Sequence, residues 1–311
     1  MVVALYMLDL DSLSKTMRGG SPLLFLSAIA VILVMYVIQS ARWELMAGRV
    51  LKSSPVMNAA VYFNATFLNT FTPANLGGDA YRLVVLKSET VSTGEILRLL
   101  LRERILGLYG YVIVFASAYG FIVATKARTF RWEGNPYIYG LAGAMAFLML
   151  PFLARPLGIC LVGALRSVIG KLRLPKLEGW VVTLAYLLSP KGALRLMLLT
   201  FLGILFWVLS IRIVAESFGL QVPLLHLAAA ATLVEFIRMV PVTIQGIGLR
   251  EGAFSYLLSF FGHNPEQCYV VALVAYLALS VSILLCGLIG QLLMRVEQTK
   301  IQVMRMQEKQ E

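Results

Sequence analysis

Five long apolar runs constrain this sequence more than any other feature. A helix needs about 20 largely apolar residues to cross roughly 30 Å of hydrocarbon. Only 14% of the residues are charged and 59% are hydrophobic, whereas soluble domains carry about 25% charged residues. The sequence therefore predicts an all-α, polytopic integral membrane protein that forms a single membrane domain, residues 1–311. The predicted spans are Pro22–Ala41, Ile105–Thr125, Pro136–Leu153, Leu196–Ala215 and Tyr269–Leu293.

Two further apolar runs are too short to cross a membrane. Met57–Phe71 ends just before Thr72-Pro73, and Leu224–Val240 ends at Pro241. We expect each to be one arm of a re-entrant helical hairpin, over residues 57–82 and 224–261. Broken helices of this kind are tolerated at membrane depth where protein or a water-filled cavity surrounds them. Two hairpins from opposite faces predict an inverted repeat, as in many transporters.

The basic residues indicate the orientation and argue against one class of partner. With both hairpins re-entrant, nineteen Lys and Arg residues fall on one side and five on the other, and three remain at membrane depth. The positive-inside rule places the richer side, and the C-terminus, in the cytoplasm. We therefore expect a multi-pass protein of the cytoplasmic membrane. The net charge of +11 is explained by these loops, so no nucleic-acid partner is expected.

These features divide the chain into five consecutive parts. Residues 1–21 hold the remnant of a first span and an outer loop. The first half, 22–153, and the second half, 196–294, each contain one hairpin. A basic segment along the cytoplasmic interface, 154–195, separates them, and a cytoplasmic tail, 295–311, follows the second half.

Two similar motifs follow the short apolar runs. Each opens with proline, contains an amide and two glycines, and ends with an acid and an arginine nine residues after the proline. Proline stops a helix, glycine lets a headgroup approach bare backbone, and a new helix N-terminus binds anions. Arginine adds a planar fork that suits phosphate. The candidate substrate-binding residues of the motifs are Asn75, Gly77, Gly78, Asp79 and Arg82, then Gln245, Gly246, Gly248, Arg250 and Glu251.

In this interpretation Arg82 and Arg250 bind a phosphate, and Asp79 and Glu251 orient them or contact a cationic headgroup. The plainer alternative is that both motifs are helix caps and turns with one interfacial ion pair each. Charges at membrane depth are costly and usually functional, which favours the first interpretation. Three more charged residues are candidates for the substrate pathway: Arg104, Glu235 and Arg238.

No motif for covalent chemistry or for a cofactor is present. The cysteines occur singly, the two histidines have no ligand-spaced partner, and no P-loop or HExxH sequence occurs. We therefore expect no enzyme activity, no metal and no cofactor.

The chain resembles the lysylphosphatidylglycerol synthase transmembrane-region family, the flippase-like domain of bacterial multiple peptide resistance factors. The residues that carry the resemblance are Arg42-Trp43, Asn69 through Arg82, Glu103-Arg104 and Pro241 through Glu251. The resemblance covers nearly the whole chain. It implies one more full span at the N-terminus, of which only Met1–Leu8 remains. It also implies lipid handling without synthase activity, because the soluble aminoacyl-transferase domain is absent.

The leading hypothesis is a flippase-like transporter that moves a polar or anionic lipid across the membrane. Phospholipids, aminoacyl-phospholipids and lipid-linked headgroups are all candidate substrates. One alternative is a membrane-embedded transferase that acts on a lipid-linked substrate. Another is a non-catalytic partner of a separate lipid-modifying enzyme.

Overall fold

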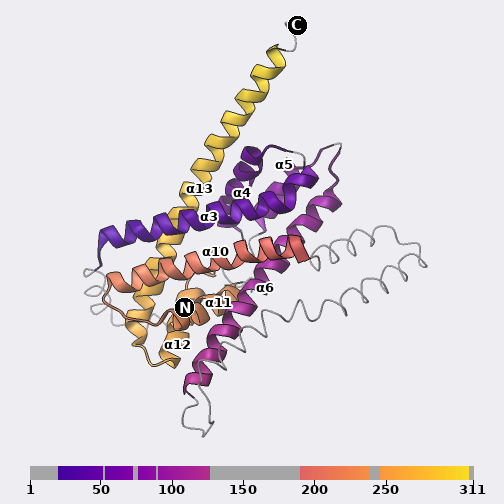
Figure 1. Ribbon diagram of the computed structural model, residues 1–311. Helices are drawn as coiled ribbons and strands as arrows, with labels where there is room; N and C mark the ends of the chain where they lie inside the picture. Colours follow the sequence, from indigo (N-terminus) through magenta and orange to yellow (C-terminus); the bar gives the residue numbers. More distant parts are fainter. Residues whose placement is uncertain are drawn as a thin grey trace, which may run out of the picture.

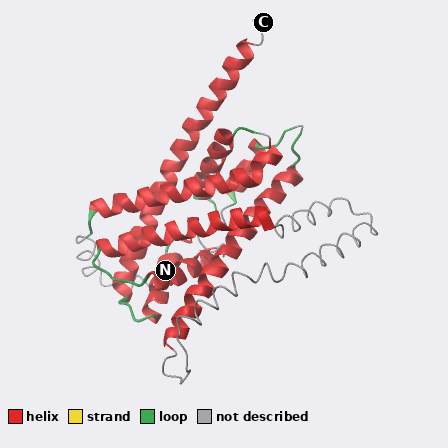
Figure 2. Ribbon diagram, viewed as in Figure 1, coloured by secondary structure: helices red, strands yellow, loops and turns green. Residues whose placement is uncertain are grey.

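The computed structural model describes residues 20–51, 53–72, 76–88, 90–126, 190–238 and 246–307. Within these ranges every regular element is an α-helix (Figure 2). The helices are α3 (Pro22–Leu51), α4 (Pro55–Asn69), α5 (Gly77–Val85), α6 (Thr93–Lys126), α10 (Pro190–Ser217), α11 (Leu224–Arg238), α12 (Leu249–Phe260) and α13 (Pro265–Gln307). The prediction of an all-α fold is confirmed for this part of the chain.

Four of these helices, α3, α6, α10 and α13, are long and apolar enough to cross a membrane. They confirm four of the five predicted spans, and the protein is a multi-pass membrane protein. The fifth predicted span, 136–153, lies outside the described residues, as does the N-terminal remnant up to residue 19. The predicted interfacial segment, 154–195, also lies outside them apart from its last six residues, which begin α10.

Helices α4 and α5 fold back on each other and are called hairpin 1 here. Ser54 caps α4 by accepting a hydrogen bond from the Met57 backbone N–H at 3.1 Å, and Pro55 occupies the first turn. The 15 residues of α4 span only about 22 Å at 1.5 Å per residue. The Asn64 amide near the middle of α4 donates to the Tyr81 hydroxyl at 3.3 Å, whereas Asn69 at its end contacts Gly78. The two helices are therefore antiparallel.

Helices α11 and α12 form a second antiparallel pair, hairpin 2. At its open end the His226 and His263 rings lie 2.9 Å apart, Nδ1 to Nε2. At its tip Gly246 lies against the Arg238 side chain, where an added Cβ would sit 3.1 Å from Arg238 Cγ. Both expected half-length helix pairs are thus present. Their entry and exit on one membrane face, and the inverted repeat, stay predictions.

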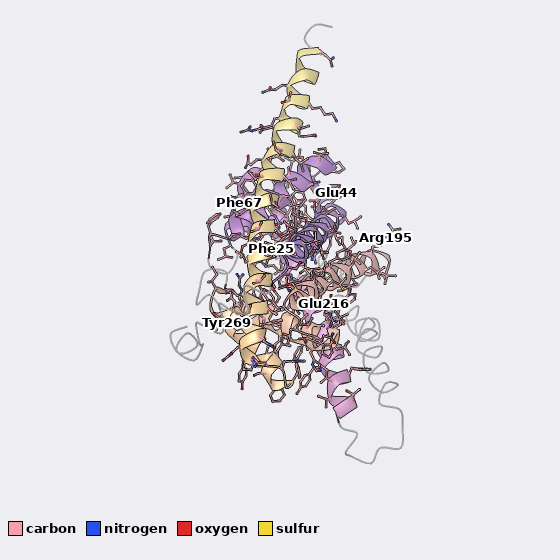
Figure 3. The ribbon with its side chains drawn as sticks, turned by 90° about the vertical axis from the view of Figure 1, so that its left-hand side faces the viewer. Phe25, Glu44, Phe67, Arg195, Glu216 and Tyr269 are labelled. Atoms are coloured by element: carbon pink, nitrogen blue, oxygen red, sulfur yellow. The ribbon has the colours of Figure 1, made fainter. Side chains whose placement is uncertain are left out.

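Helix α13 runs the length of the molecule, and the hairpins approach it from opposite ends (Figure 1). Hairpin 1 starts beside Glu297, which accepts a hydrogen bond from Ser54 at 2.5 Å, and its tip reaches Gly287, which lies against Phe67. Hairpin 2 has its tip beside Tyr276, which lies under Arg250, and its open end beside the start of α13. Figure 3 labels Phe67, near the tip of hairpin 1, and Tyr269, near the start of α13. The two tips therefore face each other across the middle of α13.

Helices α3 and α10 pack along each other and complete the walls of the bundle. Their direction is antiparallel, because Arg42 bonds Thr200 while Gln39, one turn earlier, lies against Gly203. Helix α6 packs along α11. Many large apolar side chains, such as Val37 and Leu288, remain exposed on the outside, as expected where lipid rather than water is the solvent.

Candidate functional site

A polar cavity of about 210 Å³ lies at the centre of the bundle, between the tips of the two hairpins. Six helices contribute to its wall. From α13 come Leu279 and Ile283, which lie between the two levels at which the hairpin tips meet that helix. Its polar, aromatic and charged lining residues are Tyr36, Gln39, Arg42, Tyr62, Thr66, Asn69, Tyr111, Trp207, Glu235 and Arg238. We call it the central cavity.

The charge of this lining favours an anion. Two of the lining residues are arginines and one is a glutamate, so the wall carries one net positive charge. The three tyrosines add hydroxyl groups that can donate hydrogen bonds. In addition, Gln39 Oε1 and Arg42 Nε are buried without a hydrogen-bond partner among the described residues. Buried polar atoms left in this way are costly and suit a polar ligand.

Arg42 belongs to a buried ion-pair network that joins four helices. Its guanidinium donates to Thr200 Oγ1 on α10 at 3.0 Å and lies 3.7 Å from Glu103 Oε1 on α6. The other carboxylate oxygen, Glu103 Oε2, is closer to Arg82 on α5 and accepts a hydrogen bond from it at 2.5 Å. The side chains of Arg42 and Arg82 are only 6% and 5% exposed. One carboxylate thus lies between two buried arginines and balances only one of their two positive charges.

Arg82 does not line the central cavity. Its guanidinium lies over the rings of Trp43 and Tyr62, at 4.4 and 5.2 Å from their centroids. Both the rings and Glu103 lie on the buried side of α5, which explains why Arg82 faces inward. Arg82 therefore holds hairpin 1 against α3 and α6. Its guanidinium, which was expected to bind a phosphate, instead contacts Glu103 and the two aromatic rings.

Asp79 was expected to orient Arg82 or to contact a cationic headgroup, and the first of these two alternatives is wrong. Asp79 instead accepts two hydrogen bonds from Arg104, at 2.6 and 3.0 Å. The reason is the position of the Arg102-Glu103-Arg104 cluster, which lies inside α6 because that helix begins at Thr93 rather than near Ile105. Consecutive residues point in different directions on a helix. Glu103 therefore turns inward to Arg82, and the half-exposed Arg104 reaches the N-terminus of α5.

The glycines of the first motif allow close contact between the arms of hairpin 1. The Gly78 N–H donates to Asn69 Oδ1 at 2.7 Å, and the Gly77 N–H donates to Thr72 Oγ1 at 2.8 Å. A Cβ on Gly78 would lie 2.2 Å from the Ala65 carbonyl oxygen. Side chains of the hairpin itself therefore take the N–H groups predicted to bind an anion. Asn75 lies outside the described residues.

The second motif pairs its arginine and acid as expected. Glu251 Oε1 accepts from Arg250 Nε at 2.8 Å, while Oε2 accepts from the Gly248 N–H at 2.7 Å. Gly246 and Gly248 have φ of +74° and +82°, values that glycine adopts readily. The Arg250 guanidinium stacks on Tyr276 at 4.2 Å. This cluster is buried beside α13 and does not line the central cavity, and Gln245 lies outside the described residues.

Glu235 and Arg238 do line the central cavity. Their side chains form an ion pair at 2.6 Å, one turn apart on α11. Arg238 is 23% exposed whereas Glu235 is 5% exposed, so the arginine is the more accessible member. Of the thirteen residues predicted from sequence, these two are the ones that the described structure brings to the central cavity.

The remaining cavity residues were missed as ligands, although the sequence contained a signal for some of them. Gln39 lies inside the predicted span Pro22–Ala41, where a polar residue suggests function, and Arg42 directly follows that span. Tyr36, Gln39 and Arg42 share one face of α3, at helical spacings of three residues. The aromatic residues from α4, α6 and α10 carried no signal, because apolar helices contain aromatic residues in any case.

Comparison with known families identifies the chain. A family model described as the lysylphosphatidylglycerol synthase TM region matches residues 1–287. The chain belongs to this family. Searches of curated proteins and of solved structures each found no match. Membership of the lysylphosphatidylglycerol synthase TM region family agrees with a multi-pass membrane protein that handles lipids.

Proposed function

We propose that this member of the family moves an anionic lipid across the membrane, with the lipid headgroup passing through the central cavity. The observation that carries the proposal is that one polar, net positive cavity lies between the facing tips of two broken helix pairs. Half-length helices that meet at such a site are typical of transporters that open to each face in turn.

Arg42 and Arg238 are the proposed phosphate ligands. Both line the central cavity, from α3 and α11 respectively. An arginine offers five N–H donors, so Arg238 can keep its bond to Glu235 while other N–H groups face a ligand. Arg82 and Arg250 act as positioning residues in this scheme, because each is buried with a carboxylate and an aromatic ring outside the cavity.

The test is lipid movement in reconstituted vesicles. Fluorescent phosphatidylglycerol is placed in both leaflets, and a reductant added outside bleaches only the label that it can reach. Bleaching of label that began in the inner leaflet measures movement. The variants are Arg42→Gln and Arg238→Gln. Arg212→Gln is the control, because Arg212 pairs with Glu216 away from the cavity. Gel filtration checks that every variant is folded.

We expect both cavity variants to move lipid roughly tenfold more slowly or worse, the loss expected for one charged hydrogen bond. Arg212→Gln should resemble the wild type. Equal rates in all variants would refute the assignment of the cavity as the headgroup site. A wild type that moves none of the anionic lipids tried would refute translocation and favour a transferase or a partner of a lipid-modifying enzyme.

A further inference from the structure

The ion pairs of the described residues differ between the central cavity and the rest of the bundle. Four pairs outside the cavity contain a hydrogen bond, with donor and acceptor atoms 2.5 to 3.0 Å apart. A hydrogen bond fixes the direction of the arginine as well as its distance. These pairs are Arg82–Glu103, Arg104–Asp79, Arg212–Glu216 and Arg250–Glu251.

The two arginines that line the cavity, Arg42 and Arg238, have looser ion pairs. Arg42 lies 3.7 Å from Glu103 Oε1, which is beyond hydrogen-bond distance. Arg238 lies 2.6 Å from Glu235 Oε2, yet this oxygen has no hydrogen-bond partner among the described residues. Since the distance is short enough, the N–H groups must point in another direction. Arg238 is therefore attracted by Glu235 without being aligned with it.

The burial of Glu235 gives this loose pairing a consequence. The Glu235 side chain is 5% exposed and that of Arg238 is 23% exposed, and both line the cavity. A buried carboxylate is costly unless a positive charge lies beside it, so the two side chains balance each other whenever no ligand is bound. A phosphate that enters the cavity brings a second negative charge to the same guanidinium. The two anions then compete for Arg238.

We infer that Glu235 is the resident counter-ion of the headgroup site: it competes with the bound phosphate for Arg238 and so promotes release of the ligand. This inference rests on the proposed function and gives Glu235 a positioning role that acts through Arg238. As in ion channels, a site on a transport path must bind its ligand weakly enough to let it leave. Because Glu235 regains the arginine as the phosphate departs, release leaves no buried charge without a partner.

The plainer alternative is that Glu235 only holds Arg238 in place, and the two roles predict opposite signs. If Glu235 orients Arg238, replacing it by glutamine should weaken anion binding, as the loss of Arg238 itself should. If Glu235 competes with the anion, Glu235→Gln should strengthen binding, because the ligand no longer shares the arginine.

Binding and movement are measured on the same purified full-length proteins. Dihexanoyl phosphatidylglycerol, a short-chain probe, is titrated into each protein and its binding is followed by isothermal titration calorimetry. Lipid movement is measured in the vesicle assay described above. The control is Glu216→Gln, because its pair with Arg212 is hydrogen-bonded and neither residue lines the cavity. The test variants are Glu235→Gln, Glu235→Asp, Arg238→Gln and the double variant Glu235→Gln with Arg238→Gln.

We expect Glu235→Gln to bind the probe about tenfold more tightly than the wild type and to move lipid about tenfold more slowly, the change expected for one close charge pair. Glu235→Asp places the carboxylate one methylene further from Arg238 and should fall between the two. The gain in affinity should vanish in the double variant, because it acts through Arg238. Glu216→Gln should change neither affinity nor rate.

Weaker or unchanged binding by Glu235→Gln would overturn the inference. A gain that persists without Arg238 would also overturn it, because a general electric field would then be the cause. Glu235→Asp gives the same sign test, so the result does not depend on one variant that folds.

These outcomes are separate from those of the proposed function. If Arg42→Gln and Arg238→Gln blocked lipid movement while Glu235→Gln bound the probe no more tightly, the competition would fail and the headgroup site would stand. Tighter binding by Glu235→Gln in a protein that moves no lipid would support the competition alone. A wild type that neither bound the probe nor moved lipid would refute both.

Discussion

The network around Glu103 yields the sharpest prediction about stability. Glu103 is 14% exposed and faces two arginines that are almost fully buried. Replacing it by glutamine keeps the shape of the side chain but removes the negative charge. Breaking a buried ion pair by removing one partner costs about 3–5 kcal/mol, since the other charge is left uncompensated. We expect Glu103→Gln to lower the free energy of unfolding by about that amount.

The two arginines should be less costly to remove than the carboxylate. In Arg82→Met, Glu103 still lies 3.7 Å from Arg42, so no buried charge is left without a counter-ion. The double variant Glu103→Gln with Arg82→Met should then be less destabilised than the sum of its single changes. Neighbouring residues that interact show such non-additivity, by about 0.5–3 kcal/mol.

Unfolding in detergent micelles, followed by tryptophan fluorescence against increasing sodium dodecyl sulfate, measures these differences. Glu216→Gln is the matched control, because the side chains of Arg212 and Glu216 are 30% and 48% exposed and solvent-exposed pairs contribute about 0–1 kcal/mol. The reasoning would be refuted if Glu103→Gln and Glu216→Gln lost the same amount, or if Arg82→Met lost more than Glu103→Gln.

Two further predictions concern the hairpins. Gly78→Ala should separate the arms of hairpin 1 and destabilise the protein by about 1–3 kcal/mol, since its Cβ would clash with the Ala65 carbonyl, whereas Gly120→Ala meets nothing within 4 Å; equal melting temperatures would contradict this. The His226 and His263 rings are hydrogen-bonded at the open end of hairpin 2, Nδ1 to Nε2 at 2.9 Å. His226→Phe removes this hydrogen bond, so amide hydrogen exchange at the open end of hairpin 2 should be faster in the variant than in the wild type at the same pH; equal exchange rates would count against it.

The positions of the broken helices could be predicted from sequence because the signals are local. Proline and glycine follow each short apolar run, and the structure ends α4 and α11 within a few residues of the expected points. The helix lengths were harder to predict. Helix α6 begins twelve residues before the expected span at Ile105, because a helix can extend past the bilayer on a polar and charged face.

The composition of the site depended on distant contacts, which local motifs do not reveal. Arg82 lies in a glycine-rich motif, yet its orientation is fixed by Glu103, 21 residues away. Arg42 bonds Thr200 across 158 residues, and no feature of either segment alone predicts that contact. Glu235 and Arg238 were predicted as residues of the substrate pathway, because charges within an apolar run must face a polar space. Both line the central cavity, and their contact with a substrate stays a prediction.

The unequal distances around Glu103 indicate how the central cavity can accept a ligand without leaving a buried charge without a counter-ion. The carboxylate holds Arg82 at 2.5 Å and Arg42 at 3.7 Å, and the second distance is too long for a hydrogen bond. If Arg42 turns toward a phosphate in the central cavity, Glu103 stays neutralised by Arg82. The bound phosphate then supplies the second negative charge that the two arginines lack.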